Sequence, residues 1–231
     1  MSQTHSRYLV RQAEQKDIPE IIEFCRAVYR ESPPWTTEQL NSHQKIFPEG
    51  QLVVFCPKNQ ELIGMASSLI VNWDDYNWES PWKDFTDRGM FTNHDPKNGR
   101  TLYGAEIMVH PKAQGTGAGS LLYRAREALV LRLKLLRIRA GARLRGYHKY
   151  ASKMSAEDYV LSVNKEEIKD PTLSFQLKRG FQVLRLVEGY LRHDPESLGF
   201  AAVIEWINLQ VARPKDYDVS RSSKFYKSRN I

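Results

Sequence analysis

The sequence feature that most constrains the fold is the glycine-rich run Gln114–Gly119, which lies between a strand-like and a helix-like segment. After Gln114, no side chain in this run is larger than threonine. The segment before it, Thr101–His110, has strand character. After it, apolar residues recur at helical spacing, at Leu121, Leu122, Ala125, Leu129 and Leu133. The order strand, glycine loop, helix gathers backbone N–H groups at the start of a helix, where they can hold a pyrophosphate without a lysine.

Two common nucleotide-binding patterns do not fit this loop. A Rossmann fingerprint would need glycine where Ser120 stands, and the loop lacks the Gly-Lys pair of the Walker pattern. Small residues also serve simply to let a helix pack on a strand. The loop pattern by itself therefore leaves a structural and an anion-binding explanation open.

Two helices are predicted ahead of most of the strands. Apolar residues at three- and four-residue spacing mark the first helix, at Ile18, Ile21, Ile22, Cys25 and Tyr29. Asp17 and Glu20 are expected to form its capping box. Thr36 and Gln39 repeat that pattern for a second helix, which ends at Pro48–Gly50.

The remaining elements follow from apolar runs and turn residues. Leu52–Cys56 and Leu62–Val71 predict an antiparallel hairpin. Later elements are expected at Arg137–Ala142 (strand), Gly146–Lys169 (a mainly helical insertion capped at Ser155), Asp170–Gly180 (the last helix), and Phe181–Leu186 and Ala201–Trp206 (strands). Together these segments predict a mixed α/β (α+β) fold, in which helices flank a mostly antiparallel central sheet.

The formal net charge of +7 is concentrated near the C-terminus. Arg213–Ile231 holds six basic and two acidic residues. We therefore expect one domain at residues 1–210 and a basic tail at 211–231, with about the last fifteen residues disordered. Because no interleaved aromatic and basic pattern accompanies the charge, the sequence does not favour a nucleic-acid partner.

The sequence also bears on location and on metals. The N-terminus has no apolar run of signal-peptide length, and no later segment reaches the length of a membrane span, so we expect a cytoplasmic protein with no membrane partner. Cys25 and Cys56 fall inside apolar segments rather than at metal-ligand spacing. They are expected to be buried reduced thiols, and no metal site is predicted.

The segment Glu106–Gly119 resembles the cofactor motif of the GNAT superfamily of N-acetyltransferases, which reads Gln/Arg-x-x-Gly-x-Gly/Ala after a strand. Gln114, Gly117 and Gly119 match its three marked positions. The resemblance covers most of residues 7–208 and implies a GNAT-type sheet with acetyl-CoA as cosubstrate. It implies that the cosubstrate contacts Met108, Val109, Gln114, Gly115, Thr116, Gly117, Ala118, Gly119 and Ser120.

Three later segments narrow the resemblance to one subgroup of the superfamily. Gly141–Tyr150, Asp170–Gln176 and Glu205–Asn208 look like the GNAT modules that are fused ahead of carbon–nitrogen hydrolase (nitrilase-like) domains. No hydrolase domain follows before Ile231, so we expect a stand-alone relative of that module. The acceptor of the subgroup does not come with the resemblance.

The resemblance assigns the chemistry to the strand before the loop. Val109 matches the residue whose N–H polarises the acetyl carbonyl, and such a donor stabilises the charge that forms when an amine attacks. Strand alternation puts Glu106 and Met108 on one face of the strand. The opposite face then holds Ala105, Ile107 and Val109. Glu106 is the candidate base for the amine proton, and a structural carboxylate paired with an arginine or lysine is the alternative.

One position departs from the family pattern. In many GNAT enzymes a tyrosine four residues before the closing Gly-Phe protonates the departing thiolate, but here Gln176 stands in that place. Glutamine cannot act as a general acid. Either Tyr147, Tyr150 or Tyr190 takes this role, or the thiolate leaves unassisted, or the domain binds its cofactor without catalysing transfer.

The segment Asn72–Gly99 is too long for an ordinary connection. It interleaves acidic with aromatic residues, among them Trp73 and Trp78. Such a mixture can attract a cation and so form a lid over an amine acceptor. Alternatively, the aromatic residues only hold the insertion onto the body of the protein.

These features favour an acyltransferase, specifically an N-acetyltransferase that moves an acetyl group from acetyl-CoA directly to an amine. The acceptor is expected to be a small molecule or a peptide. A catalytically silent CoA-binding or regulatory adaptor domain is the alternative function. The sequence leaves the acceptor, the acyl-chain preference and a homodimeric state open.

Overall fold

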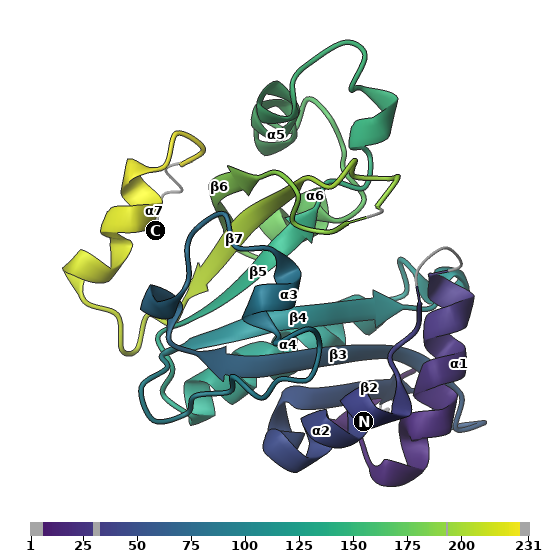
Figure 1. The fold of residues 1–231 in the computed structure, drawn as a ribbon. Coiled ribbons are helices and arrows are strands. Elements are labelled where there is room, and N and C mark those ends of the chain that lie inside the picture. The colour runs from purple at the N-terminus through teal and green to yellow at the C-terminus, as the bar shows by residue number, and fades with distance from the viewer. Residues whose placement is uncertain (1–6, 30–32, 193, 227–231) are drawn as a thin grey trace, which may run out of the picture.

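The computed structural model describes residues 7–29, 33–192 and 194–226, which form a seven-stranded sheet. The strands are β1 (Leu9–Gln12), β2 (Gln51–Phe55), β3 (Leu62–Val71), β4 (Thr101–Val109), β5 (Arg137–Arg143), β6 (Gln182–Val187) and β7 (Ala201–Ile207). Their order is β1-β2-β3-β4-β5-β7-β6, and all neighbours in it are antiparallel except β4 and β5 (Figure 1). The expected mixed, mostly antiparallel sheet is therefore confirmed.

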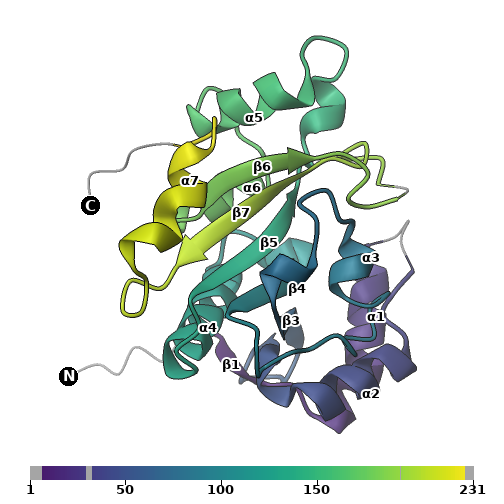
Figure 2. The ribbon, with the colours of Figure 1, turned by 60° about the vertical axis from the view of Figure 1, so that its left-hand side comes forward.

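Helices cover both faces of this sheet. The helices are α1 (Ile18–Val28), α2 (Thr37–Ile46), α3 (Trp82–Phe85), α4 (Ala118–Arg132), α5 (Ala156–Asn164), α6 (Leu173–Lys178) and α7 (Asp218–Ser222). Helices α1, α2 and α3 lie on one face of the sheet and α4 on the other, as Figures 1 and 2 show together. None of the helices in the described ranges has both the length and the apolar character that a membrane crossing requires.

The hydrophobic core is divided by the sheet. One cluster fills the α1 face, and it includes Phe24, Leu69, Phe85 and Met108. On the other face, a second cluster joins α4, α5 and α6 to the C-terminal strands. All ten residues of β3 are buried, because this central strand has packed neighbours on both faces.

Two helix starts show how local sequence sets local structure. The capping box of α2 is confirmed: Thr36 Oγ1 accepts from the N–H of Gln39 (3.1 Å), and Gln39 Oε1 accepts from the N–H of Thr36 (3.0 Å). The box expected for α1 is wrong. The Asp17 carboxylate instead accepts from the N–H of Glu14 (2.7 Å), because a 3-10 turn over Gln15–Asp17 precedes the helix. Glu20 Oε1 accepts from the N–H of Leu62 and so binds α1 to β3.

The expected disordered tail is a second correction. Residues 214–217 form a 3-10 turn that leads into α7, and Ser220 donates to Glu205 on β7 (2.6 Å). Phe225 is 2% exposed, and its carbonyl accepts from the Asn164 amide on α5 (2.7 Å). A buried aromatic side chain therefore fixes this basic segment against the domain. Residues 227–231 of the expected tail lie outside the described ranges.

The expected helical insertion is present as α5, and one carboxylate joins it to α6. Ser155 caps α5 by accepting from the N–H of Asp158 (3.0 Å), as the sequence indicated. The fully buried Asp170 accepts through Oδ1 from the N–H groups of Thr172 and Leu173, both at 2.8 Å. Its Oδ2 atom accepts from the N–H of Gly146 and from the Tyr159 hydroxyl, both at 2.9 Å.

We expect Asp170→Asn to lower the free energy of unfolding by about 1–3 kcal/mol, because the new NH₂ group cannot accept the buried N–H of Gly146. Urea unfolding followed by circular dichroism measures this change. Tyr159→Phe is the matched variant. It removes one hydroxyl donor and leaves the backbone bonds, so it should cost only about 1 kcal/mol. Equal costs for the two variants would contradict this account of the carboxylate.

Candidate active site

A β-bulge in β4 determines which side chains face each side of the sheet. Ser67 pairs with Glu106 whereas Ser68 pairs with Gly104, so Ala105 is an extra residue in the strand. Ala105 consequently packs in the α1-side cluster with Met108, while Ile107 and Val109 pack on the α4 side. The expectation that Ala105 shares a face with Ile107 and Val109 is therefore wrong. The bulge shifts the alternation by one residue, which sequence periodicity does not reveal.

Side chains from both faces of the sheet hold this bulge. From α4, the buried Arg126 donates to Ser68 Oγ (2.9 Å), to the Ser67 carbonyl (2.7 Å) and to the Glu106 carbonyl. From α3, the Trp82 indole N–H donates to the Ala105 carbonyl (2.9 Å). The backbone carbonyls that lose their partners in the regular strand pairing at the bulge therefore accept hydrogen bonds from side chains.

Beyond the bulge, β4 and β5 separate. Their parallel pairing is confined to Thr101–Tyr103 against Arg137–Arg139, and Figure 1 shows the two strands diverging toward their C-terminal ends. The N–H of His110 donates to the Ile63 carbonyl (2.9 Å), which sets the phase of the β3–β4 ladder. Because alternate residues bond in opposite directions, the N–H groups of Ile107 and Val109 point away from β3. They face the opening between β4 and β5.

The glycine loop lies at the end of β4 that borders this opening. Gly115 (φ +76°) and Gly117 (φ +97°) adopt left-handed conformations, and Gly117 is the N-cap of α4 without a side-chain cap. A Cβ atom built on either glycine would meet nothing within 4 Å. Thr116 Oγ1 donates to the Ala113 carbonyl (2.5 Å) and so fixes the turn. The first-turn N–H groups of α4 are thus presented to open space.

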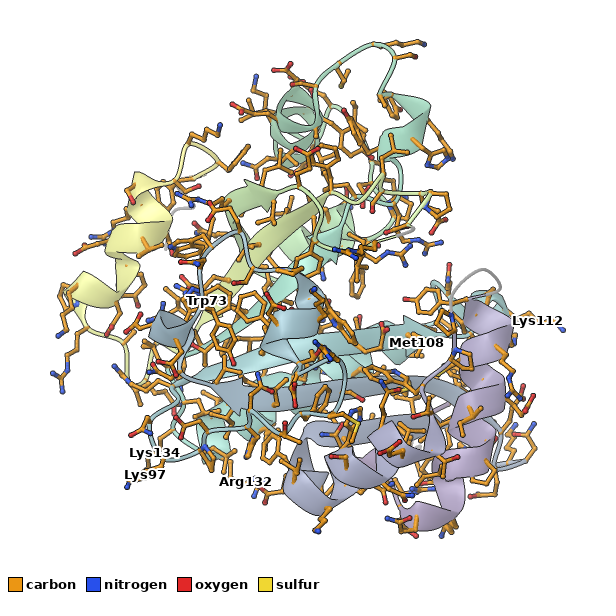
Figure 3. All side chains as sticks on the ribbon, in the orientation of Figure 1. Trp73, Lys97, Met108, Lys112, Arg132 and Lys134 are labelled. Atoms are coloured by element: carbon orange, nitrogen blue, oxygen red, sulfur yellow. The ribbon has the colours of Figure 1, made fainter. Side chains whose placement is uncertain are left out.

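The other cofactor candidates gather at the same place. A Cβ atom on Gly119 would lie 3.6 Å from Val109 Cγ2, so the start of α4 packs against the last residue of β4. Gln114 is exposed and has an extended backbone. Figure 3 shows Met108 near the C-terminal end of β4, with Lys112 farther out at the rim of the molecule. The loop and the strand end therefore form one continuous site.

Glu106 is partly buried on the α1 face, beside the opening. Its Oε1 atom accepts from the N–H of Ile107 (2.9 Å) and from the Tyr29 hydroxyl (3.3 Å). Burial raises the pKa of Glu106, and the Ile107 N–H and the nearby Arg143 guanidinium oppose that rise. Arg143 forms its own ion pair with Asp194, at 2.6 Å. The Glu106 carboxyl is thus held by two neutral donors, in a site where burial raises its pKa above the ordinary value.

The tyrosines that the sequence offered as proton donors lie in different places. Tyr147 and Tyr150 pack against Tyr159 of α5, and we call this group of tyrosines the α5 cluster. The ring of Tyr190 fills the space above Gly141 on β5, and its hydroxyl is hydrogen-bonded to the Tyr103 hydroxyl. Of the three, Tyr190 lies beside the strands that separate.

Gln176 is buried, and its amide donates to the hydroxyl of Tyr123 on α4 (2.9 Å). Sequence reasoning missed Tyr123, and it also missed Tyr29 and Arg126. Arg126 could have been found, because it lies on the same helical stripe as Leu122 and Leu129, where a charged residue needs a buried partner.

The aromatic residues of Asn72–Gly99 mainly pack on the body of the protein. Trp73 stacks on Phe85 (4.9 Å), Phe85 stacks on Tyr103 (4.7 Å), and the Arg139 guanidinium lies 4.4 Å from the centre of the Trp73 ring. In Figure 3, Trp73 lies at the opposite end of the sheet from Met108. These contacts favour the packing explanation for Trp73. Trp82 is the member of this segment that reaches the bulge.

Comparison with known proteins identifies relatives of this chain. A family model described as the acetyltransferase (GNAT) family matches residues 17–149. The uncharacterized N-acetyltransferase YkwB of Bacillus subtilis is 38% identical over 175 residues, which make up 76% of each chain. The probable hydrolase YhcX of the same species is 41% identical over 229 residues, or 99% of this chain. The chain spans 43% of the length of that relative.

A solved structure shares the fold. The GNAT-like decarboxylase GphF, solved in complex with isobutyryl-CoA, superposes with a TM-score of 0.71 over 86% of this chain and 98% of its own. The two sequences are 19% identical, so this likeness concerns the fold alone.

The raised pKa of Glu106 predicts a pH-dependent effect on stability. Because the folded state holds this proton more tightly than the unfolded state, the stabilisation from Glu106 is complete below its ordinary pKa of 4.5 and is lost as pH rises through the folded-state pKa. Glu106→Gln removes that loss. The unfolding free energy of the variant relative to the parent should therefore increase with pH above 4.5, by about 1.4 kcal/mol per unit of pKa shift.

Urea unfolding at a series of pH values measures this difference. Glu196→Gln is the control with the opposite sign, because a hydrogen bond from Arg145 lowers the pKa of Glu196. That variant should be least stable relative to the parent near neutral pH, and the gap should close in acid. A pH-independent difference for Glu106→Gln would show that its carboxyl is not perturbed by burial.

Proposed function

Because the chain belongs to the acetyltransferase (GNAT) family, we propose that it transfers an acetyl group from acetyl-CoA directly to an amine at the opening between β4 and β5. The observation that carries this proposal is the continuity of two features. An uncapped helix N-terminus with free space above it lies next to a strand end at which the N–H of Val109 faces an opening. The first suits a pyrophosphate, and the second suits a thioester carbonyl.

The loop fits the phosphate portion of acetyl-CoA. The groups proposed to hold it come from Gln114, Gly115, Thr116, Gly117, Ala118, Gly119 and Ser120, chiefly through their backbone N–H groups. The empty Cβ positions at Gly115 and Gly117 support this fit, since a phosphate can approach the backbone where no side chain intervenes. Both glycines also have conformations that other residues rarely adopt.

Val109 is the proposed donor to the acetyl carbonyl. Its N–H points into the opening, where negative charge develops on the carbonyl oxygen as the amine attacks. One preorganised donor of this kind contributes about 3–4 kcal/mol to stabilisation of a transition state. Met108 precedes it, and its buried side chain fixes the strand on the α1 face.

Glu106 is the proposed base. An amine with a pKa of about 10 is mostly protonated at neutral pH and must lose a proton before it can attack. Glu106 lies on the same strand as Val109, three residues away, and burial raises its pKa toward the range in which a carboxylate works well as a base. The hydroxyl of Tyr29 and the N–H of Ile107 orient it.

A catalytically silent CoA-binding domain is the second candidate function, and Gln176 favours it. Its amide can donate a hydrogen bond but cannot supply a proton. The two functions differ in one measurement, the release of free CoA thiol from acetyl-CoA in the presence of a panel of small-molecule and peptide amines. Release that depends on an amine supports transfer, whereas binding without release supports the silent domain.

Gly117→Val is expected to abolish the rise in melting temperature that acetyl-CoA produces. The valine side chain would occupy the open space over the first turn of α4, and ligand binding to the native state is what raises the melting temperature. Thermal unfolding with and without acetyl-CoA tests this. Gly189→Val is the matched control, since Gly189 also has a positive φ (+68°) with nothing within 4 Å but lies between β6 and β7.

Both variants carry similar backbone strain, so both melt lower than the parent without ligand. Only Gly117→Val should lose the ligand-induced rise. A full rise in a folded Gly117→Val protein would refute the assignment of the loop.

Glu106→Gln is expected to lower kcat by about 10²–10⁴-fold, the usual contribution of general-base catalysis, with little change in the Kd of acetyl-CoA. The pH–rate profile should also lose the acidic limb that belongs to this carboxyl. Glu49→Gln is the control, because Glu49 pairs with Arg132 near the end of α4 that lies away from the loop. Unchanged kcat in Glu106→Gln across the pH range would assign Glu106 a structural role.

A further inference from the structure

Tyr123 lies on α4 between two residues that contact β4. It follows Gly119 by four residues and precedes Arg126 by three, so the three share one face of the helix. Gly119 packs beside Val109, and Arg126 reaches the Glu106 carbonyl. Tyr123 is therefore level with the stretch of β4 between these two contacts. This is the stretch whose N–H groups face the opening.

The ring of Tyr123 is turned toward α6. Its centre lies 5.6 Å from both the Phe175 and the Phe181 ring, in edge-on arrangements, and only 4% of the residue is exposed. The neighbouring Leu122 packs instead with buried residues of β2 and β3, among them Val54 and Ala66. Tyr123 thus projects to the β5 side of β4, where the two strands have separated.

The hydroxyl of Tyr123 is held in a defined position. It accepts a hydrogen bond from the Gln176 amide at 2.9 Å, so the bond uses an oxygen lone pair and leaves the O–H available as a donor. The Arg126 and Arg179 guanidinium groups lower the pKa of Tyr123, but burial outweighs them and raises it overall. The phenol therefore stays protonated at neutral pH.

We propose that the Tyr123 hydroxyl donates a hydrogen bond to the coenzyme A sulfur as the carbon–sulfur bond breaks. This inference rests on the proposed acetyl transfer and adds a catalytic residue to it. The residue at the usual position, Gln176, then positions the donor from α6 instead of serving as the donor itself.

The reaction balances without an added reagent. The amine nitrogen attacks the carbonyl carbon and forms a C–N bond, and the electron pair of the broken C–S bond stays on sulfur. The nitrogen proton passes to Glu106 and from there, through solvent, to the thiolate. Tyr123 keeps its own proton, since a tyrosine pKa of about 10 already exceeds a thiol pKa of about 8.5.

The test measures the pKa of the coenzyme A thiol in its complex with the protein, from the ultraviolet absorbance of the thiolate. A hydrogen bond to a charged group shifts such an equilibrium by about ten- to a hundredfold. Tyr123→Phe should therefore raise the pKa of the bound thiol by about one to two units and lower kcat by about ten- to a hundredfold. The KM for acetyl-CoA should change much less than kcat.

Tyr147→Phe is the matched control. Tyr147 is also buried, but its hydroxyl donates to the Met154 carbonyl in the α5 cluster (3.3 Å), so its removal should leave the thiol pKa unchanged. The double variant Tyr123→Phe with Gln176→Tyr returns a hydroxyl from α6. It should lower the thiol pKa again and recover part of kcat, whereas a purely structural role for Tyr123 predicts no such recovery.

Two results separate the inference from the function on which it rests. A Tyr123→Phe protein that binds coenzyme A with an unchanged thiol pKa overturns the role of Tyr123 alone. A parent protein that does not bind coenzyme A overturns the proposed function. If Tyr123→Phe does not fold, 3-fluorotyrosine at position 123 keeps the ring and makes the hydroxyl a stronger donor. It should lower the thiol pKa, and an unchanged value overturns the inference.

Discussion

The site depends on one extra residue in β4 and on the two side chains that hold it there. Arg126 binds the bulge from the α4 face and Trp82 binds it from the α3 face, so Ala105 is fixed between two layers of the protein. Without the extra residue, the strand beyond it would shift by one position, and each side chain there would move to the other face. Glu106 would then leave the α1 face, and the Val109 N–H would turn toward β3. The orientation of the proposed donor and base therefore follows from the bulge.

Holding the bulge with a buried arginine has an energetic cost. Taking a guanidinium out of water is unfavourable, and burial lowers the pKa of Arg126 for that reason. The cost is offset because its N–H groups donate to three neutral acceptors, which are the Ser68 hydroxyl and the backbone carbonyls of Ser67 and Glu106. A lysine could not match this planar set of donors. Gly104 completes the arrangement, since a Cβ atom there would lie 3.0 Å from the Arg126 side chain.

Much of the architecture could be read from local sequence, whereas the site could be read only in part. Apolar periodicity and capping residues predicted α2 and α5, because Thr36 and Ser155 act within a few residues of themselves. The run Gln114–Gly119 predicted the loop before α4, because its glycines also act locally. The bulge was not predictable, since it is set by Arg126 and Trp82, which lie about twenty residues away on either side. The C-terminal segment is ordered because Phe225 is buried. That burial could not be predicted from local sequence, since Phe225 packs against the assembled sheet and α5.

The burial of Arg126 also decides how the site responds to salt. Mobile counterions surround exposed charges, so the potential of Lys112 at the rim falls off within about 10 Å at 0.1 M salt (Figure 3). Arg126 lies under the bulge, where ions do not enter, and its field on the opening is screened far less. Long-range attraction of the proposed anionic cosubstrate by surface lysines therefore weakens as ionic strength rises. The contribution of Arg126 to the field at the proposed donor and base changes much less, because this charge lies in the core.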